Sequence, residues 1–446
     1  MDTARSLTLK ALLKVEENKA YSNLVLNSIL SESNLNCKDK TLCSALFYGV
    51  LERKITLKYI ISKYSKIPLE KISKEVLFIL FIGIYQLKFM DRVPQSAAVN
   101  ETVKLAKKTK NFSSTGFING ILRNFVRNNC NDYIDELTNE NVKYLSVKYS
   151  CPKHLVKLWL KDYGEENTVG ILNSFFKTPS FDIRVNTLKT NTTALAEILK
   201  SEGVVCEKIN VCSDALTVKS TGQIENLNSF KSGLFHVQNL ASQLCMKVLN
   251  LKPGQVLVDV CSAPGGKSFT AAEMMQNTGK IYSYDLYEHK VGLIKAGARR
   301  LGINIINADV KDAKAGNSEK AFADMVLCDV PCSGFGIIGR KPEIRYKPVD
   351  NFLELPKLQY EILCNAEKLL KKGGRLLYST CTLNRKENNE IADKFLKEHT
   401  NYKPVEIEIC IAGIKKNNFE RGNQLTLLPH VHNTDGFFIS LFEKME

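Results

Sequence analysis

The first third of the chain follows a helical pattern of apolar and polar positions. From Ala4 to about Arg127, leucine, isoleucine and valine return every three or four residues, which is the spacing of amphipathic helices. After a first pair of helices, we expect further helices over residues 42–51, 59–64, 76–89, 97–106 and 117–126. The residues that separate these segments are Pro68, Pro94 and Gly116. The pattern predicts an all-α domain over residues 1–130.

The pattern of the chain changes twice in its middle part. Residues 128–140 are polar and acidic, as in a linker, whereas residues 141–177 are again helical and carry the only tryptophan, Trp159. After Pro179, alternation with a period of two appears, which is typical of strands. The expected elements are two strands with a helix between them, at residues 181–186, 193–201 and 215–218. We therefore expect a linker and a small α+β connector domain over residues 131–232.

From Gly233 onward, short apolar strands alternate with helical segments, which is the pattern of a parallel sheet covered by helices. The expected strands are 255–260, 280–284, 304–308, 325–328 and 375–379, with closing strands at 425–428 and 436–442. Asp285, Asp309 and Asp329 each follow one of these strands. Because parallel strands end at one shared edge, where ligands bind, we expect the three carboxylates near one site. The pattern predicts an α/β domain over residues 233–446.

One stretch of this domain, residues 256–267, has the pattern of a nucleotide-binding turn. It reads V-L-V-D-V-C-S-A-P-G-G-K, so an apolar strand runs into glycines and then into a helical segment. Glycines allow a ligand close to the backbone, and a helix N-terminus offers unpaired N–H groups. Cys261 stands where a Walker A loop needs its first glycine, and G-x-G-x-x-G is also absent. The stretch therefore favours an S-adenosylmethionine (SAM) loop over an ordinary tight turn, with Asp285 placed to hold the ribose hydroxyls.

Two cysteines end further strands on the same edge. Cys332 follows the fourth strand in D-V-P-C-S-G, and Cys381 follows the fifth in S-T-C-T. Carbon 5 of a pyrimidine is a poor nucleophile, and a thiolate that adds to carbon 6 activates it. A cationic sulfonium nearby would favour the thiolate, and Asp329 could hydrogen-bond the cytosine ring. Free cysteines are usually buried packing residues, and that interpretation stays open for both.

Positive charge is concentrated at one end of the chain. The 446 residues carry a net charge of +15, with an isoelectric point near 9.1. Residues 1–130 hold 21 Lys and Arg against 10 Asp and Glu, so most of the excess lies in the predicted all-α domain. This distribution favours an anionic partner such as RNA, although a general lysine-rich composition would also raise the total.

The cysteine pattern indicates a reducing compartment. The 13 cysteines form no C-x-x-C pair and no secretion signal stands at the N-terminus, so we expect a cytoplasmic protein. The histidines lack metal-ligand spacing, and we expect no metal. The longest apolar run, residues 76–87, is too short to cross a bilayer and is expected to be a buried helix.

Motifs throughout the chain resemble one family, the RNA 5-methylcytosine methyltransferases. The α/β domain carries its signatures in D-V-C-S-A-P-G-G-K-S, D-V-P-C-S-G-F-G and Y-S-T-C-T. Further matches are residues 183–186, 237–242, 340–346 and 429–438. The N-terminal third is similar to the RNA-binding antitermination factor NusB, notably in V-P-Q-S-A-A-V-N-E and G-F-I-N-G-I-L-R. The combination resembles the RsmB (Sun/Fmu) branch, which modifies small-subunit ribosomal RNA.

The resemblance implies a class I, Rossmann-like methyltransferase domain that uses SAM to modify carbon 5 of a cytosine in 16S ribosomal RNA. It implies that Cys381 is the nucleophile, that Cys332 assists product release, and that Asp329 contacts base and cofactor. The cofactor-binding residues that it implies are Cys261, Ser262, Ala263, Pro264, Gly265, Gly266, Lys267, Asp285, Asp309 and Asp329. We expect a monomer that requires neither a metal nor a membrane.

Three other functions stay open at this point. The chain could methylate a nitrogen or oxygen of RNA or protein, although the paired cysteines speak against it. It could modify another RNA, such as tRNA, by the same chemistry. It could also be a non-catalytic RNA-binding or antitermination protein, although the intact glycine loop argues against that as the main role.

Overall fold

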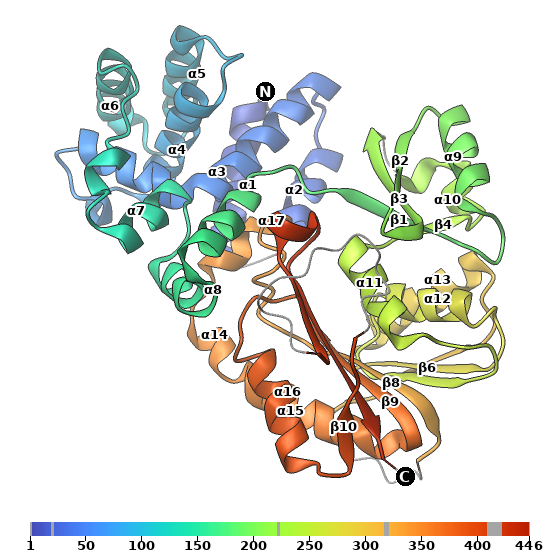
Figure 1. Ribbon diagram of the computed structural model, residues 1–446. Helices are drawn as coiled ribbons and strands as arrows, with labels where there is room; N and C mark the ends of the chain where they lie inside the picture. Colours follow the sequence, from blue (N-terminus) through green and yellow to red (C-terminus); the bar gives the residue numbers. More distant parts are fainter. Residues whose placement is uncertain (1, 19–21, 221–223, 316–320, 408–421, 446) are drawn as a thin grey trace. The chain divides into compact units, whose positions relative to one another are not determined.

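The computed structural model contains two compact units (Figure 1). It describes residues 2–18, 22–220, 224–315, 321–407 and 422–445. The first, the helical unit, comprises Met1–Phe176 together with Arg340–Lys347. The second, the sheet unit, comprises Lys177–Gly339 and Pro348–Glu446. The chain therefore leaves the sheet unit after Gly339, contributes a short segment to the helical unit, and returns at Pro348.

The helical unit is built around one apolar helix. Its helices are α1 (Ala4–Asn18), α2 (Ser22–Ser31), α3 (Cys37–Tyr64), α4 (Lys74–Phe89), α5 (Gln95–Lys107), α6 (Thr115–Arg127), α7 (Asn141–Lys148) and α8 (Lys153–Ser174). Helix α4 is buried along most of its length, and α1, α3, α5 and α6 all pack against it. A helix that is apolar on all sides has to be covered in this way. The expected buried helix over residues 76–87 is confirmed.

Two details of this unit differ from the sequence expectation. The two helices expected over residues 42–51 and 59–64 are one continuous helix, α3, of 28 residues. The Asn36 side chain caps its start by accepting a hydrogen bond from the Asp39 N–H, at 2.9 Å. The expected linker contains a 3-10 turn, η3 (Ile134–Leu137), whose two apolar residues are buried against Tyr59. The polar residues around Ile134 and Leu137 gave no sequence indication that these two side chains are buried.

The connector at the start of the sheet unit is a small α+β layer. Its strands are β1 (Phe181–Val185), β2 (Val205–Ile209), β3 (Cys212–Ser220) and β4 (Phe235–Val237), with helices α9 (Thr192–Ser201) and α10 (Asn228–Lys231). Among the described residues the strands pair antiparallel in the order β2-β3-β1-β4. Arg184 on β1 forms a buried ion pair with Glu273 on α12 (Gly266–Met274), with 2.6 Å between Nε and Oε2. This pair ties the connector to the helix that follows the glycine loop.

The large sheet has the doubly wound arrangement that the sequence predicts. Its strands are β5 (Val256–Asp259), β6 (Lys280–Asp285), β7 (Ile306–Val310), β8 (Ala323–Asp329), β9 (Leu370–Thr380), β10 (Tyr402–Pro404), β11 (Gln424–Leu427) and β12 (Phe437–Lys444). The order is β10-β12-β9-β8-β5-β6-β7, with β11 beside β12. Strands β5 to β9 pair in parallel, whereas β10, β11 and β12 are antiparallel.

Helices cover both faces of this sheet (Figure 1). They are α11 (Leu240–Leu249), α12, α13 (Glu288–Leu301), α15 (Leu355–Ala366) and α16 (Asn389–Glu398), and the unit also contains the short helices α14 (Asp350–Leu353) and α17 (Pro429–His432). One buried apolar cluster joins the sheet to α11, α12 and α13, and another joins it to α15 and α16. After β5 the chain builds outward to β6 and β7, and it then returns to add β8 and β9 on the other side. The switch point beside β5 is where a doubly wound sheet binds its ligand.

Candidate active site

The glycine loop joins the end of β5 to the start of α12. Gly265 precedes α12 with a φ of +109°, and a Cβ there would approach the Phe269 ring to 2.5 Å. Glycine is therefore required on both conformational and steric grounds. The loop is fixed to the neighbouring strand because both the N–H and the hydroxyl of Ser262 donate to the Tyr284 carbonyl, at 2.8 and 2.9 Å. The sequence predicts this strand–loop–helix unit correctly.

A cavity of about 190 Å³ opens beside this loop. Its lining joins the glycine loop to the segment before α11: Val237, Gln238, Asn239, Ser242, Asp259, Cys261, Ser262, Ala263, Pro264, Gly266, Lys267 and Asp329. Three buried polar atoms of this lining, Asp259 Oδ1, Gln238 Nε2 and Asn239 Nδ2, have no hydrogen-bond partner in the described part of the chain. Such atoms are costly unless a ligand or water satisfies them. The carboxylate and the two amides suit a ligand with both a cationic and an anionic end.

Asp259 is the most perturbed carboxyl group of the cavity. Burial raises its pKa to about 7, against the stabilising hydrogen bond that Oδ2 accepts from the Ser268 hydroxyl, at 2.7 Å. A cation bound at its unpartnered oxygen would favour the ionised form. Asp259 and the two amides before α11 were not among the predicted site residues. Their position inside or next to apolar segments gives a sequence signal too weak to separate them from packing residues.

Asp285 and Asp309 end up in different environments. Asp285 is buried at the end of β6, where its Oδ2 accepts from the Ala263 N–H at 3.3 Å and its Oδ1 accepts from the Tyr287 N–H at 3.4 Å. The carboxylate thus lies against the glycine loop, and its predicted role in binding SAM stays a prediction. Asp309 is exposed within β7, and neither it nor Asp285 lines the cavity described above. Its role in cofactor binding stays a prediction.

Asp329 ends β8 and connects the glycine loop to β9. One carboxylate oxygen pairs with the Lys267 ammonium at 2.6 Å, and the other accepts from the Ser379 hydroxyl at 2.8 Å. Burial opposes the charge of Lys267, but the attraction of Asp329 and its neighbours outweighs it, and the pKa of Lys267 is raised. The carboxylate is therefore held in one orientation by two adjacent elements.

The two predicted catalytic cysteines are brought together by the strand order. Cys332 follows β8 and Cys381 follows β9, and these strands are parallel neighbours. Their sulfur atoms lie 3.2 Å apart in a partly buried environment. A hydrogen bond to Cys381 and burial raise the pKa of the Cys332 thiol well above its usual value. The protonated form of the Cys332 thiol is therefore favoured.

A buried polar network that the sequence motifs did not reveal supports both cysteines. The fully buried Glu387 accepts from the Ser333 N–H, at 2.9 Å, and from Gln359 Nε2, at 2.9 Å. Asn388 accepts from the Thr380 hydroxyl at 2.6 Å and donates to the Thr382 carbonyl at 2.9 Å. These bonds hold the residues next to Cys332 and Cys381. The available signal was the polar run N-R-K-E-N-N after the second cysteine, which reads equally well as a helix start.

The loop after Cys332 also touches the chain after Cys381 directly. The Gly336 N–H donates to the Cys381 carbonyl at 3.0 Å, and the Gly336 carbonyl accepts from the Gly436 N–H at 2.9 Å. A Cβ on Gly336 would lie 2.0 Å from the Gly436 carbonyl oxygen. Glycine is therefore needed for three segments to meet behind the thiols.

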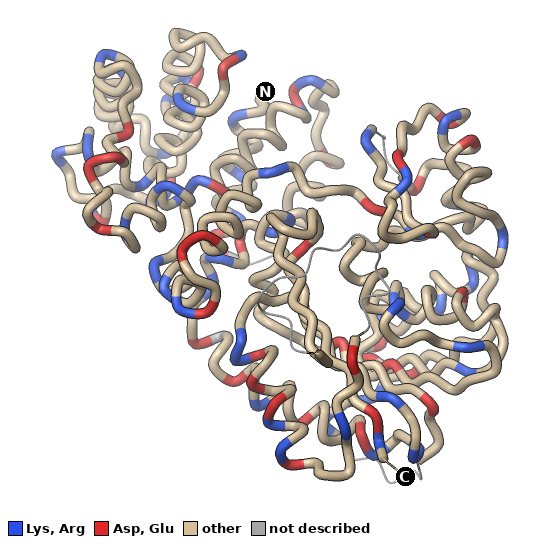
Figure 2. The backbone as a smooth tube through the Cα atoms, viewed as in Figure 1, with Lys and Arg blue, Asp and Glu red and all other residues tan. Residues whose placement is uncertain are grey.

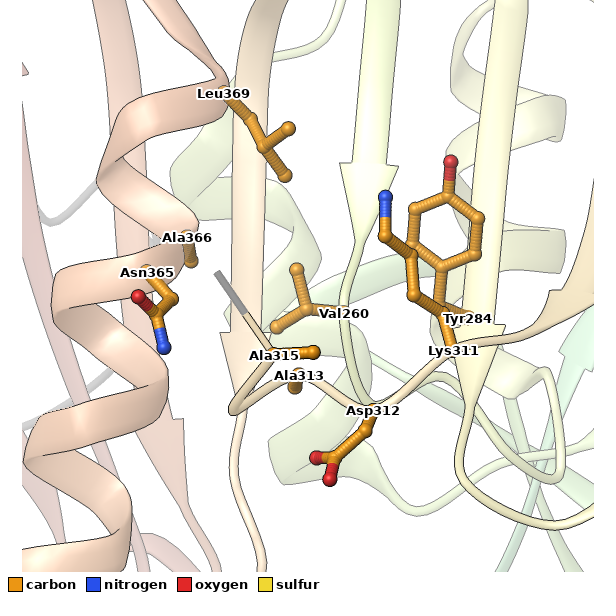
Figure 3. Close-up of a pocket in the computed structure, with 9 residues that line it drawn as sticks. All are labelled: Val260, Tyr284, Lys311, Asp312, Ala313, Ala315, Asn365, Ala366 and Leu369. Carbon is orange, nitrogen blue, oxygen red and sulfur yellow. The ribbon is translucent and has the colours of Figure 1, made fainter. Parts of the chain in front are cut away.

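A second, much smaller cavity lies beside Val260 and Tyr284 (Figure 3). Side chains from β6, from the segment after β7 and from α15 line it, and it offers about 10 Å³, which is roughly the room for one water molecule. It is too small for a nucleoside. The larger cavity beside the glycine loop remains the candidate ligand site.

Three known protein families match successive parts of the chain. Residues 246–443 match the family described as 16S rRNA methyltransferase RsmB/F, residues 2–127 match the NusB family, and residues 151–225 match the ferredoxin-like domain of RsmF/B-like methyltransferases. The fold and the glycine loop therefore belong to an RNA methyltransferase with an added NusB domain. Full-length relatives define the family more narrowly.

One relative, the probable ribosomal RNA small subunit methyltransferase B of Bacillus subtilis, is 37% identical over 446 residues, which cover 99% of each chain. The corresponding enzyme of Photorhabdus laumondii is 30% identical and covers 99% of this chain and 98% of its own. The chain belongs to the ribosomal RNA small subunit methyltransferase B family. The predicted family is confirmed, and with it the dependence on SAM that the family implies.

Solved structures agree with this fold. The crystal structure of PH0851 superposes with a TM-score of 0.80 at 26% identity, covering 98% of this chain and 99% of the other. NSun6 from Pyrococcus horikoshii, solved with SFG, has a TM-score of 0.60 at 22% identity, covering 66% of this chain and 98% of its own. The latter likeness concerns the fold alone. The predicted fold class is confirmed.

Two other kinds of feature are absent from the described ranges. No helix there is long and apolar enough to cross a membrane. No group of three or more His, Cys, Asp or Glu side chains there is arranged to hold a metal ion.

Proposed function

We propose that this methyltransferase modifies carbon 5 of a cytosine in small-subunit ribosomal RNA through a covalent bond to Cys381. The observation that supports this most strongly is the thiol pair, with 3.2 Å between the sulfur atoms, at the ends of two neighbouring parallel strands. Methylation of a nitrogen or oxygen needs no thiol, whereas carbon 5 of a pyrimidine needs activation by a nucleophile. The relatives described above are named as methyltransferases of small-subunit ribosomal RNA, which favours this class of RNA.

In the proposed reaction, Cys381 first adds to the base and is later released from it. The Cys381 thiolate forms a bond to carbon 6, and the ring electrons make carbon 5 nucleophilic. SAM, when bound, supplies the electrophilic methyl group. After transfer, carbon 5 gives its proton to a solvent water, the electrons of that bond re-form the double bond between carbons 5 and 6, the bond between sulfur and carbon 6 breaks, and its electron pair returns to Cys381. Cys332 is close enough to assist this second stage by giving its thiol proton to the departing Cys381 sulfur, and its raised pKa keeps that proton in place until then.

Asp329 is proposed to recognise the cytosine. Its carboxylate is fixed between Lys267 and Ser379, so it can accept from the exocyclic amino group without first having to be ordered. A carboxylate at this position would favour cytosine over uracil, which presents a carbonyl there.

The residues that are proposed to hold SAM fit its mixed charge. The loop residues Cys261–Lys267 line the cavity or border it, and Asp285 lies against the loop where ribose hydroxyls would be expected. The unpartnered atoms of Asp259, Gln238 and Asn239 suit the ammonium and carboxylate groups of the amino-acid end. Asp309 and Asp329 complete the proposed set.

The helical unit is proposed to bind RNA. Lys104, Lys107, Lys108 and Lys110 follow one another at the end of α5 and just beyond it, and all are exposed. The second halves of both α5 and α6 carry Lys and Arg (Figure 2). We further propose that the chain acts as a cytoplasmic monomer, and that residues 1–130, 131–232 and 233–446 are its functional domains.

The proposal can be tested by bisulfite sequencing of ribosomal RNA from a deletion strain. We expect one 5-methylcytosine of the small subunit to be lost, to return with the wild-type gene, and to stay absent with Cys381→Ala. Loss of a 5-methylcytosine in tRNA instead would favour the other RNA substrate. An unchanged methylation pattern in the deletion strain would contradict an enzymatic role on RNA cytosine.

A further inference from the structure

The segment Arg340–Lys347 lies eight residues after Cys332 in the chain but belongs to the helical unit. Its 3-10 turn, η5 (Pro342–Tyr346), buries Pro342, Ile344 and Arg345. Arg345 is fully buried, which is unusual for an arginine and normally requires specific partners. The segment is therefore an integral part of the helical core.

Hydrogen bonds fix this segment to three separate parts of the helical unit. The Glu343 carboxylate accepts from the N–H and the hydroxyl of Ser22 at the start of α2, at 3.2 and 2.9 Å. Arg345 Nη1 donates to the carbonyls of Glu52 in α3, Tyr149 and Ser150, at 3.5, 3.4 and 3.3 Å. A carboxylate at a helix N-terminus and a cation surrounded by carbonyls are both electrostatically favourable.

Tyr346 reaches the middle of α3 itself. Its hydroxyl donates to the Leu51 carbonyl at 2.8 Å, while the Ser150 hydroxyl accepts from the Ile55 N–H at 2.9 Å. In a regular helix, the carbonyl of residue 51 and the N–H of residue 55 pair with each other. Tyr346 therefore takes part in the backbone hydrogen bonding of α3, the longest helix of the unit. Its position is coupled to the backbone of α3.

The residues just before this segment, 331–339, form the loop that carries Cys332, called the Cys332 loop below. Within the sheet unit the loop is held at Ser333 by Glu387 and at Gly336 by the chain beyond Cys381. Ile338 is fully buried, and the chain enters the helical unit at Arg340. The loop therefore has one set of anchors in each unit.

We propose that Arg345 is a positioning residue, which fixes the downstream end of the Cys332 loop by anchoring it in the helical unit. The helical unit then has a role in catalysis beyond binding RNA. This inference rests on the proposed roles of the two thiols, because a displaced Cys332 would slow the second stage. Displacements of about 1 Å at a reacting group can lower a rate up to about a hundredfold.

Hydrogen exchange of the full-length protein tests the anchor without reference to activity. We expect Arg345→Met to speed exchange in peptides covering both residues 331–339 and residues 340–347. Arg345→Lys, which keeps the charge and can donate to carbonyls, should restore part of the protection. Lys357→Met, a change at an exposed lysine of α15, is the matched control and should leave these peptides unchanged. Faster exchange in residues 340–347 alone would overturn the proposal.

Kinetics on the same proteins test the consequence. At saturating RNA and SAM, methylation by Arg345→Met should slow by about tenfold or more, with an unchanged dissociation constant for SAM. An unchanged turnover rate would overturn the proposal. If Arg345→Met fails to fold, Tyr346→Phe replaces it, because it removes only one hydroxyl. The same two measurements, hydrogen exchange and the methylation rate, then apply to Tyr346→Phe. A wild-type enzyme that never forms a Cys381 adduct would contradict the proposed function, whereas the exchange result would stand.

Discussion

Asp259 has a pKa raised to about 7 by burial, from an ordinary value of 3.8. Between about pH 4 and pH 7, the Asp259 carboxyl group therefore keeps its proton in the folded state and loses it in the unfolded chain. This preference stabilises the fold fully below about pH 4, and the contribution is lost as the pH rises through about 7.

Replacing this carboxyl group should remove that pH dependence. In the absence of SAM, we expect Asp259→Asn to gain about 1–3 kcal/mol in free energy of unfolding relative to the wild type between about pH 5 and pH 8. Asparagine stays neutral and can still accept from the Ser268 hydroxyl. Thermal unfolding of both proteins across that pH range measures the difference. Parallel pH profiles would show that Asp259 titrates normally.

Asp285 offers a test of the cofactor site. We expect Asp285→Ala to weaken SAM binding about tenfold to a hundredfold, because charge-assisted hydrogen bonds contribute about 1.5–3 kcal/mol. Asp285→Asn keeps an acceptor for the Ala263 N–H and should lose less affinity. Calorimetry with SAM provides both values. Wild-type affinity in a folded Asp285→Ala protein would remove this residue from the site.

At the scale of elements, the buried Glu387 network fixes the loop after β8 to the start of α16. We expect Glu387→Ala to lower the methylation rate strongly and to leave SAM binding unchanged, because the carboxylate supports Ser333 and Gln359 and lies outside the cavity. The unpaired donors should also cost about 1–3 kcal/mol each in stability. Glu390→Ala, at an exposed position of α16, is the matched control. Equal activity of the two variants would contradict a supporting role.

The elements that the sequence predicts well are those with long, regular patterns. The strands around the glycine loop and the helices of the N-terminal third follow directly from the spacing of apolar residues and from the glycines and prolines that separate the segments. Strand β2 was not predicted because its residues are mostly exposed, and β4 and β10 because each has only 3 residues. Such strands depend on their partners more than on their own residues.

The site was predictable only in part for a similar reason. Motifs identify Cys332, Cys381 and Asp329, but their contacts depend on the order of strands in the sheet, which local patterns do not encode. The supporting residues Glu387 and Gln359 come from helical segments without a distinctive motif. Arg345 is buried by residues of the helical unit that lie far away in the sequence, so its burial could not be predicted from its sequence neighbours.

At the scale of the whole molecule, the excess of positive charge in residues 1–130 predicts RNA binding that depends on salt. We expect Lys107→Glu with Arg123→Glu in the full-length protein to weaken RNA binding and to reduce the salt dependence, because each lost phosphate contact lowers the slope by about 0.7–0.9. Both side chains are exposed. Lys397→Glu, on the exposed side of α16, is the control for net charge. Identical affinities for all three proteins would place the RNA elsewhere.

The proposed mechanism depends on the order in which the two thiols act. Cys332→Ala should still form the bond between Cys381 and carbon 6 and accept the methyl group, but it should stall before release. Cys381→Ala should bind SAM and RNA without forming any bond, because it lacks the nucleophile. Packing cysteines would instead lower stability in both variants and trap nothing.

The most direct measurement is denaturing electrophoresis of each variant after incubation with substrate RNA and SAM labelled in the methyl group. The proposed mechanism predicts a labelled protein–RNA adduct with Cys332→Ala and none with Cys381→Ala. An adduct with Cys381→Ala alone would reverse the two roles. Methylation at a normal rate by both variants would contradict covalent catalysis by this thiol pair.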